Sequence, residues 1–594
     1  MCTYQQWDLA SLQAAKCFSR KYIEKLKTKV TDLLAKLSSK ETNDVNGKHL
    51  SIIHSYSSIK AEIDEVFAYA TCLSREDTSK EEVAVLLMNL RSMKDDLSLL
   101  LIEVRRLISG MDNIEVKQVI AKSESKSMAC FIEEMREHAQ GRLPIQIENV
   151  IEGLAQPGVR SWARLRQTLI RDIQFSIKIN GKKQIINGPR ALHLMFTSHP
   201  DPQTRKGIRN NFDEQIQDDL KIYSQAINEI VRTNVTLQEL RGQKSVLTGA
   251  LERNRLTEEA LLAMKETFES NLHKFTPYFK RKAVLIDMDS LSEVDLLANL
   301  FSDQPPIIPY EKAVNGIIEI LSDFSSDMGA YVKNAINNGW VDAENRDGKS
   351  FIQFHCYFPI SKQSRIMLRY NNDFQSLSTL AHELGHGYHS SLLSVQSVPL
   401  QDLPLTIAET ASTFSEMIVS KRMVSQTKSI EEEVFLLDEK IKTMITYLHK
   451  PFVHFLFLKE LYEKAKDGQL NHSQLNELME EKQKFVYQDS LNSYTQTEWI
   501  SNNLFWLTDK PFYNYQYCFG YLFSAGLCSL LENDILKPEA FSAFLQESGF
   551  MPVEELAQEH LGVDLKDSSF WQRAIDFLVL DVERFLCLTE PADD

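Results

Sequence analysis

Apolar residues recur three and four positions apart over most of the first 180 residues, and this periodicity limits the folds open to the chain. The stretch EEVAVLLMNLRSMKDDLSLLLIEVRRLI (residues 81–108) is typical of it. Glycine and proline, which interrupt helices, number only 21 and 17 among 594 residues. The sequence therefore predicts a mostly helical protein.

Two segments break the helical pattern and indicate strands. FSIKINGKKQIINGPRAL (175–192) alternates around an NG pair, which predicts a small hairpin. SFIQFHCYF (350–358) and SRIMLRYN (364–371) are rich in β-branched or aromatic residues and are joined by PISKQ. We place a soft boundary at about residue 195, which separates an N-terminal helical lobe (1–195) from a second domain (196–594).

The charge of the chain narrows its possible partners. A formal charge of -16 argues against general binding to nucleic acid or anionic membrane, because both require clustered Lys and Arg. No apolar run approaches the roughly 18 residues of a membrane span, and the N-terminus lacks the layout of a signal peptide. We predict a cytoplasmic protein with no nucleic-acid or membrane partner.

The eight cysteines are scattered, with no CxxC pair and no dense framework of the kind that several disulfides form. Most are predicted to be buried thiols. Cys356 lies in the predicted strand SFIQFHCYF, and Cys518 lies in the tyrosine-rich segment PFYNYQYCFGY. Neither is predicted to be a nucleophile.

The segment STLAHELGHGYHS (378–390) contains the pattern HExxH. On a helix, His382 and His386 project from one face and can bind one metal ion together, and this geometry suits Zn²⁺. Glu383 is placed to take a proton from a water molecule at that metal. At this histidine frequency the pattern is expected on the order of 0.02 times by chance.

A tetrahedral site of this kind needs a third protein ligand. A metzincin would have Gly at position 389 and His at position 392, but this chain has His389 and Leu392. A downstream helix offers Glu409 and Glu416, seven residues apart and therefore on nearly the same face. This pair fits one metal ligand with a supporting acid nearby.

With these motifs in place, STLAHELGHGYHS followed by LPLTIAETASTFSE (403–416) resembles the oligoendopeptidase F branch of the thimet oligopeptidase family of zinc metallopeptidases. The resemblance continues upstream through GWVDAENRDGKSFIQFHCYF and downstream to FYNYQYCFGYLFSAGL. The N-terminal 195 residues resemble that branch only loosely. Residues 196–594 are thus expected to form a catalytic zinc-peptidase domain.

The resemblance implies a role for each motif residue. It carries the ligands of one Zn²⁺ per chain onto His382, His386 and Glu409, and the general base onto Glu383. It gives Glu416 the supporting role that the spacing also suggests, in which an outer carboxylate holds a ligand imidazole in one tautomer.

The resemblance also implies a fold. Members of the family fold as a two-lobed helical ellipsoid with a deep central channel. The zinc lies at the floor of this channel, and a small β-sheet lies beside the HELGH helix. Such a channel would admit short unstructured peptides. The strand SFIQFHCYF would line it, so that a peptide could pair with the free edge of this strand. His355 on that strand is interpreted as structural.

The tyrosines of PFYNYQYCFGY are candidates for stabilising the oxyanion of amide hydrolysis. The resemblance favours Tyr517 and Tyr513, and Tyr521 less. If the segment were helical throughout, the three would form one stripe. The family usually carries a histidine shortly before these tyrosines, but no histidine occurs between His472 and His560.

We therefore predict a zinc-dependent endopeptidase of short unstructured peptides. The missing histidine leaves open a catalytically weak or inactive zinc-containing peptide-binding protein. A zinc aminopeptidase is a third interpretation, which the absence of a GxMEN-type segment disfavours.

Overall fold

The computed structural model describes residues 5–38, 48–123, 126–140, 142–179, 182–188, 192, 199, 201–300, 306–396, 401 and 403–590. These residues are mostly helical, as the sequence predicted. None of their helices combines the length and the apolar composition that crossing a membrane requires.

The chain forms two compact units, and each unit is assembled from stretches that are separated in the sequence. Unit 1 comprises Met1–Arg142, Pro306–Arg422 and Asn533–Gly562, and unit 2 comprises Leu143–Pro305, Met423–Glu532 and Val563–Asp594. The boundary expected at about residue 195 lies outside the described residues. The division into 1–195 and 196–594 therefore stays a prediction.

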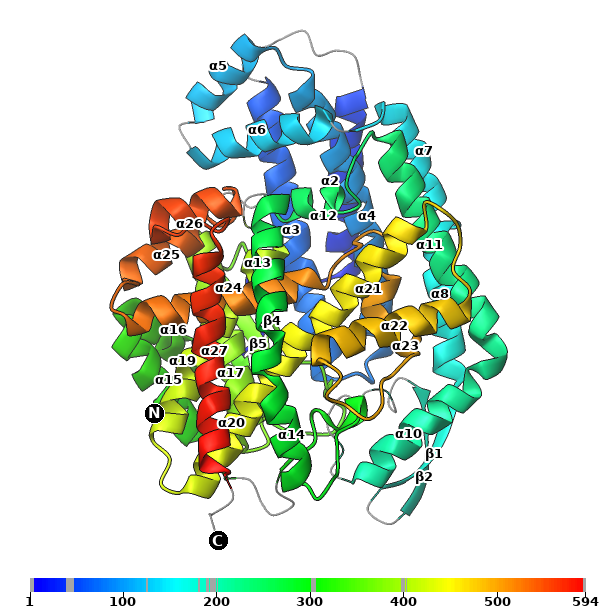
Figure 1. Ribbon diagram of the computed structural model, residues 1–594. Coiled ribbons are helices and arrows are strands. Elements are labelled where there is room, and N and C mark those ends of the chain that lie inside the picture. Colours follow the sequence, from blue (N-terminus) through cyan, green and yellow to red (C-terminus); the bar gives the residue numbers. More distant parts are fainter. Residues whose placement is uncertain are drawn as a thin grey trace. The chain divides into compact units, whose positions relative to one another are not determined.

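Unit 1 contains the HELGH helix, a three-stranded sheet and the N-terminal helices (Figure 1). Its helices are α1 (Gln13–Cys17), α2 (Arg20–Ser38), α3 (Lys48–Glu76), α4 (Glu81–Ser109), α5 (Asn113–Ser123), α6 (Lys126–Gln140), α15 (Tyr310–Phe324), α16 (Ser326–Asn337), α17 (Phe374–Leu393), α18 (Leu405–Ala408), α19 (Thr410–Ser425, to Arg422 in this unit), α25 (Pro538–Glu547) and α26 (Val553–Leu561). Its strands are β3 (Val341–Asp342), β4 (Phe354–Phe358) and β5 (Gln363–Met367).

The sheet of unit 1 has the order β3-β5-β4, with β3 parallel and β4 antiparallel to β5. The two predicted strands are present, but the first begins at Phe354 rather than at Ser350. The backbone before Phe354 bonds elsewhere, since the Ser350 amide donates to the Arg75 carbonyl and the Ile352 amide donates to the Ser350 hydroxyl. The short strand β3 was not predicted.

The two faces of β4 pack against different parts of unit 1, because side chains alternate along a strand. One face carries Phe354, Cys356 and Phe358, which pack with a buried group that we call the Trp7 cluster. That cluster consists of Trp7, Leu9, Leu12, Ala68, Cys72, Phe358 and Met367. Helix α17 also packs on β4 and β5, so β4 lies between the Trp7 cluster and the HELGH helix.

Unit 2 contains the predicted hairpin and the tyrosine segment. The hairpin strands β1 (Gln174–Ile179) and β2 (Lys182–Asn187) pair in antiparallel register, which confirms that prediction. The α-helices among the described residues of unit 2 are α7 (Ile145–Ala155), α8 (Val159–Asp172), α10 (Pro202–Gln215), α11 (Leu220–Leu240), α12 (Thr248–Arg253), α13 (Glu258–Asn271), α14 (Thr276–Leu285), α20 (Ile430–Met444), α21 (Lys450–Lys464), α22 (His472–Tyr487), α23 (Glu498–Ser501), α24 (Tyr515–Glu532) and α27 (Ser568–Leu588). Helices α24 and α27 pack against each other (Figure 1). Their contact includes aromatic rings, such as that of Phe519 against that of Trp571.

Candidate metal centre

Helix α17 places the two histidines of HELGH on one face. The helix begins after Asp373, whose side chain caps it by accepting a hydrogen bond from the Ser376 amide at 2.7 Å. His382 and His386 are one turn apart, and their rings meet edge to face with centroids 4.9 Å apart. Both rings are largely buried, with 13% and 21% of their side-chain surface exposed.

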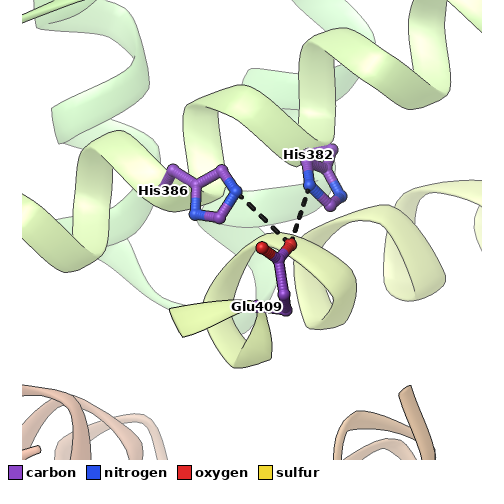
Figure 2. A group of neighbouring side chains, drawn as sticks. All are labelled: His382, His386 and Glu409. Atoms are coloured by element: carbon purple, nitrogen blue, oxygen red, sulfur yellow. Dashed lines mark ion pairs between the residues drawn. The ribbon is translucent and has the colours of Figure 1, made fainter. Parts of the chain in front are cut away.

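Glu409 lies at the junction of α18 and α19 and points at both histidines (Figure 2). Its Oε2 atom is 3.3 Å from Nε2 of His382 and 3.5 Å from Nε2 of His386. One ligand atom from each of the three side chains lies within 4.8 Å of the others. The three residues that the resemblance assigned as ligands therefore converge on one point.

This set of donors fits a zinc ion. Zn–N and Zn–O bonds of about 2.0–2.1 Å in a tetrahedron place two donor atoms about 3.3 Å apart. The two His–Glu separations of 3.3 and 3.5 Å match that spacing. Two imidazoles and one carboxylate are also the donor chemistry of catalytic zinc sites that keep one position open.

Glu416 contacts the imidazole of His382 on the side that faces away from Glu409. Its Oε2 atom is 3.1 Å from Nδ1 of His382, so Nε2 of the same ring is the nitrogen that faces Glu409. The Ser378 hydroxyl donates to Oε1 of Glu416 at 2.6 Å. A carboxylate in this position fixes the ring orientation and the tautomer of a ligand histidine. The sequence predicted that Glu416 supports a ligand histidine but not which one. In the structure the imidazole that Glu416 contacts is that of His382.

A close contact between helices brings the carboxylates within reach of α17. A Cβ atom added at Gly385 would lie 2.6 Å from the Ala411 carbonyl oxygen, from the Ser412 Cα and from the Ser415 hydroxyl. Only glycine allows α19 to approach α17 this closely. The middle residue of HELGH is therefore part of the construction of the site.

We expect Gly385→Ala to destabilise the protein and to lower its zinc affinity. The methyl group meets backbone atoms, so α19 must move away, at a cost of about 1–3 kcal/mol. Thermal unfolding and zinc titration measure the two effects. Gly316→Ala on α15 is the matched control, because its added Cβ contacts nothing within 4 Å. Alanine in a helix interior is favoured by about 1 kcal/mol over glycine, so this control should not destabilise. Equal stability of the two variants would contradict the proposed role of Gly385.

The charges of the site are strongly coupled. Burial by itself would lower the pKa of His382, but hydrogen bonds to Glu409 and Glu416 raise it well above its usual value. Burial would raise the pKa of Glu409, but the charge of His386 and hydrogen bonds from both histidines hold it well below its usual value. The carboxylates thus stabilise positive charge between the rings, which a divalent cation can supply in place of a proton.

Glu383 lies next to this group but contributes no ligand atom to it. It is 7% exposed, and burial raises the pKa of its carboxyl group. A carboxylate with a raised pKa is a stronger base, as a proton acceptor in catalysis requires.

His355 on β4 packs on the metal centre from the sheet. Its ring stacks on that of His386 with centroids 6.0 Å apart, and its Nε2 is 2.9 Å from the Ser364 hydroxyl. Burial and the charges of His386 and His389 lower its pKa well below the usual value, which favours the neutral ring.

Tyr513 and Tyr517 belong to unit 2. Both are partly buried, and their rings lie 5.7 Å apart. Tyr517 lies on α24, whereas Tyr513 precedes this helix, so the expected helical stripe is incomplete. Tyr521 is 5% exposed and stacks on Tyr447, as expected of core packing. The catalytic role of Tyr513 and Tyr517 stays a prediction.

Two contributors to the site were missed in the sequence. Ser378 lies four residues before His382 on α17, and this spacing could have identified it. The packing role of Gly385 gives no local signal, because it depends on a helix that follows some 25 residues later.

The chain is similar to known peptidases in sequence. The sequence profile of peptidase family M3 matches residues 195–577. Oligopeptidase PepF of Bacillus subtilis (strain 168) is 22% identical over 392 residues, which are 64% of this chain and 57% of that protein. The match thus spans just over half of the length of that relative.

Solved structures share the fold over nearly the whole chain. A chain from Chlamydophila abortus has a TM-score of 0.79 at 18% identity, with 98% of this chain and 100% of that one covered. Oligoendopeptidase-F from Enterococcus faecium has a TM-score of 0.71 at 15% identity, with 97% and 98% covered. At these identities the likeness is one of fold.

Proposed function

Because the chain belongs to peptidase family M3, we propose that it is a zinc-dependent endopeptidase of short unstructured peptides. The resemblance to the oligoendopeptidase F branch is confirmed by relatives named oligopeptidase PepF and oligoendopeptidase F homolog. The observation that carries the proposal is the convergence of His382, His386 and Glu409 on one point beside Glu383.

Each residue has a task in this proposal. His382, His386 and Glu409 would hold one zinc ion, which when bound acts as a Lewis acid that polarises the scissile carbonyl and makes water more acidic. Glu383 takes the proton of the attacking water on its carboxylate and returns it to the leaving nitrogen. Glu416 keeps the proton of His382 on Nδ1.

The sheet supports an extended peptide substrate. Among the strands that the structure describes, β4 pairs only with β5 and so has an open edge. His355 on this strand stacks on His386, so β4 passes beside the metal centre. A peptide that adds to β4 as a further strand would present its backbone, whatever its sequence.

On the family pattern, we assign stabilisation of the oxyanion to the phenol groups of Tyr517 and Tyr513. The histidine that relatives carry before these tyrosines is absent, and loss of one such donor costs about 10²- to 10³-fold in other hydrolases. We therefore expect a slow enzyme.

The proposal is tested with the purified full chain and a short quenched fluorescent peptide, before and after zinc removal by a chelator. We expect cleavage that stops with the chelator and returns when zinc is added. Blocking the N-terminus of the peptide should leave cleavage intact, because an endopeptidase needs no free amine. Tight peptide binding without turnover by the zinc-loaded protein would instead support a peptide-binding protein.

A further inference from the structure

Two cysteines from distant parts of the sequence meet behind the metal centre. Cys72 on α3 and Cys356 on β4 are separated by 284 positions, and their Sγ atoms lie 3.3 Å apart. Both are free thiols in unit 1. A disulfide bond has a length of about 2.05 Å, so the two sulfur atoms need to approach by only about 1.3 Å to form one.

The surroundings of the two thiols differ, and this difference determines which thiol reacts first with an oxidant. Cys72 is completely buried in the Trp7 cluster, whereas Cys356 is partly exposed. Burial and the neighbouring Cys356 thiol raise the pKa of Cys72 well above its usual value. The first attack on an external oxidant therefore falls to Cys356, because a thiolate is the reactive form and access is required.

We propose that Cys72 and Cys356 are a site of reversible oxidation, which a low-molecular-weight disulfide converts into an intramolecular disulfide that ties β4 to α3. The Cys356 thiolate attacks one sulfur of the oxidant, forms a mixed disulfide and releases one thiolate. The Cys72 sulfur then attacks the Cys356 sulfur and displaces the second thiolate. The two protein thiol protons go to the two released thiolates, so two thiols are oxidised and one disulfide is reduced.

The cross-link would act on the metal centre through β4. Cys356 and His355 are adjacent and project from opposite faces of this strand. Drawing the Cys356 sulfur toward α3 therefore draws His355 away from the His386 ring on which it stacks. This consequence rests on the proposed function, but formation of the disulfide does not.

The site is tested by oxidising the reduced full chain with excess oxidised glutathione, alkylating the remaining thiols and mapping peptides by mass spectrometry. We expect one cross-linked peptide pair that contains Cys72 and Cys356. In Cys72→Ala, glutathione should stay attached to Cys356, because no second thiol can displace it. In Cys356→Ala, Cys72 should be recovered as an alkylated thiol after denaturation. Cys528→Ala, on α24 of unit 2, is the matched control and should retain the cross-link.

Recovery of both Cys72 and Cys356 as free thiols after oxidation, or pairing with other cysteines, would overturn the proposal. Its effect on β4 is measured separately as peptide cleavage. We expect oxidation to lower the rate about tenfold, less than the about 10²-fold cost of misplacing groups by 1 Å at the reaction itself. A reducing thiol should restore the rate, and Cys356→Ala should not respond. An unchanged rate in fully cross-linked protein would overturn the coupling to the metal centre. Absence of cleavage by the reduced protein would count against the proposed function, while peptide mapping still decides the cross-link.

Discussion

Glu383→Gln is expected to lower peptide cleavage by about 10²- to 10⁴-fold, while the protein keeps its zinc. The amide has nearly the same shape as the carboxylate but cannot accept the proton of the attacking water. Because Glu383 contributes no ligand atom to the group formed by His382, His386 and Glu409, zinc binding should not change. Cleavage of a quenched peptide and zinc content by mass spectrometry measure the two properties on one sample.

The control for this variant is Glu547→Gln on α25, which removes a carboxylate of unit 1 outside the metal centre. Its cleavage rate should equal that of the unaltered protein. If Glu383→Gln cleaves at the full rate, Glu383 is not the base. Loss of zinc together with activity would instead indicate that Glu383 supports the metal rather than the proton transfer.

Glu409→Ala is expected to lose zinc, and with it cleavage. The remaining imidazoles of His382 and His386 provide only two donors, and the carboxylate that faced both of them at 3.3 and 3.5 Å is gone. Zinc content after dialysis and a competition titration with a chelating dye measure the loss. Glu416→Gln should have a smaller effect than Glu409→Ala. We expect its affinity for zinc to be about 10- to 100-fold lower than that of the unaltered protein, because Glu416 only orients His382.

A second group of metal-capable side chains in the described part of the chain provides the control for Glu409→Ala. Glu547, Glu559 and His560 offer ligand atoms within 4.8 Å of one another on α25 and α26, and Glu559 is exposed. Glu547→Ala should keep both zinc and activity. Full zinc in Glu409→Ala, with loss of zinc in Glu547→Ala, would mean that the measured zinc lies at this other group.

Much of the fold could be predicted because its signals are local. The helical periodicity, the NG hairpin and the β-branched runs each depend on residues within one element. Strand ends were less predictable, as shown by β4, which starts at Phe354 because the Ser350 amide bonds to Arg75 some 275 residues earlier. The two-residue strand β3 has too little sequence to give a pattern.

The candidate site likewise combines relations that the local sequence predicts with relations that it does not. The HExxH spacing places His382 and His386 on one face of α17, because a helix repeats every 3.6 residues whatever surrounds it. The seven-residue spacing likewise places Glu416 about two turns along α19 from Glu409, which lies directly before this helix. These relations are properties of single segments, and the sequence alone determined them.

Tertiary structure decided how the segments meet. The contact at Gly385 brings Glu409 to both Nε2 atoms and Glu416 to Nδ1 of His382. The same kind of packing sets the thiols of Cys72 and Cys356 side by side across 284 positions. Such pairings depend on which surfaces exclude water together, and no local repeat in the chain encodes that choice.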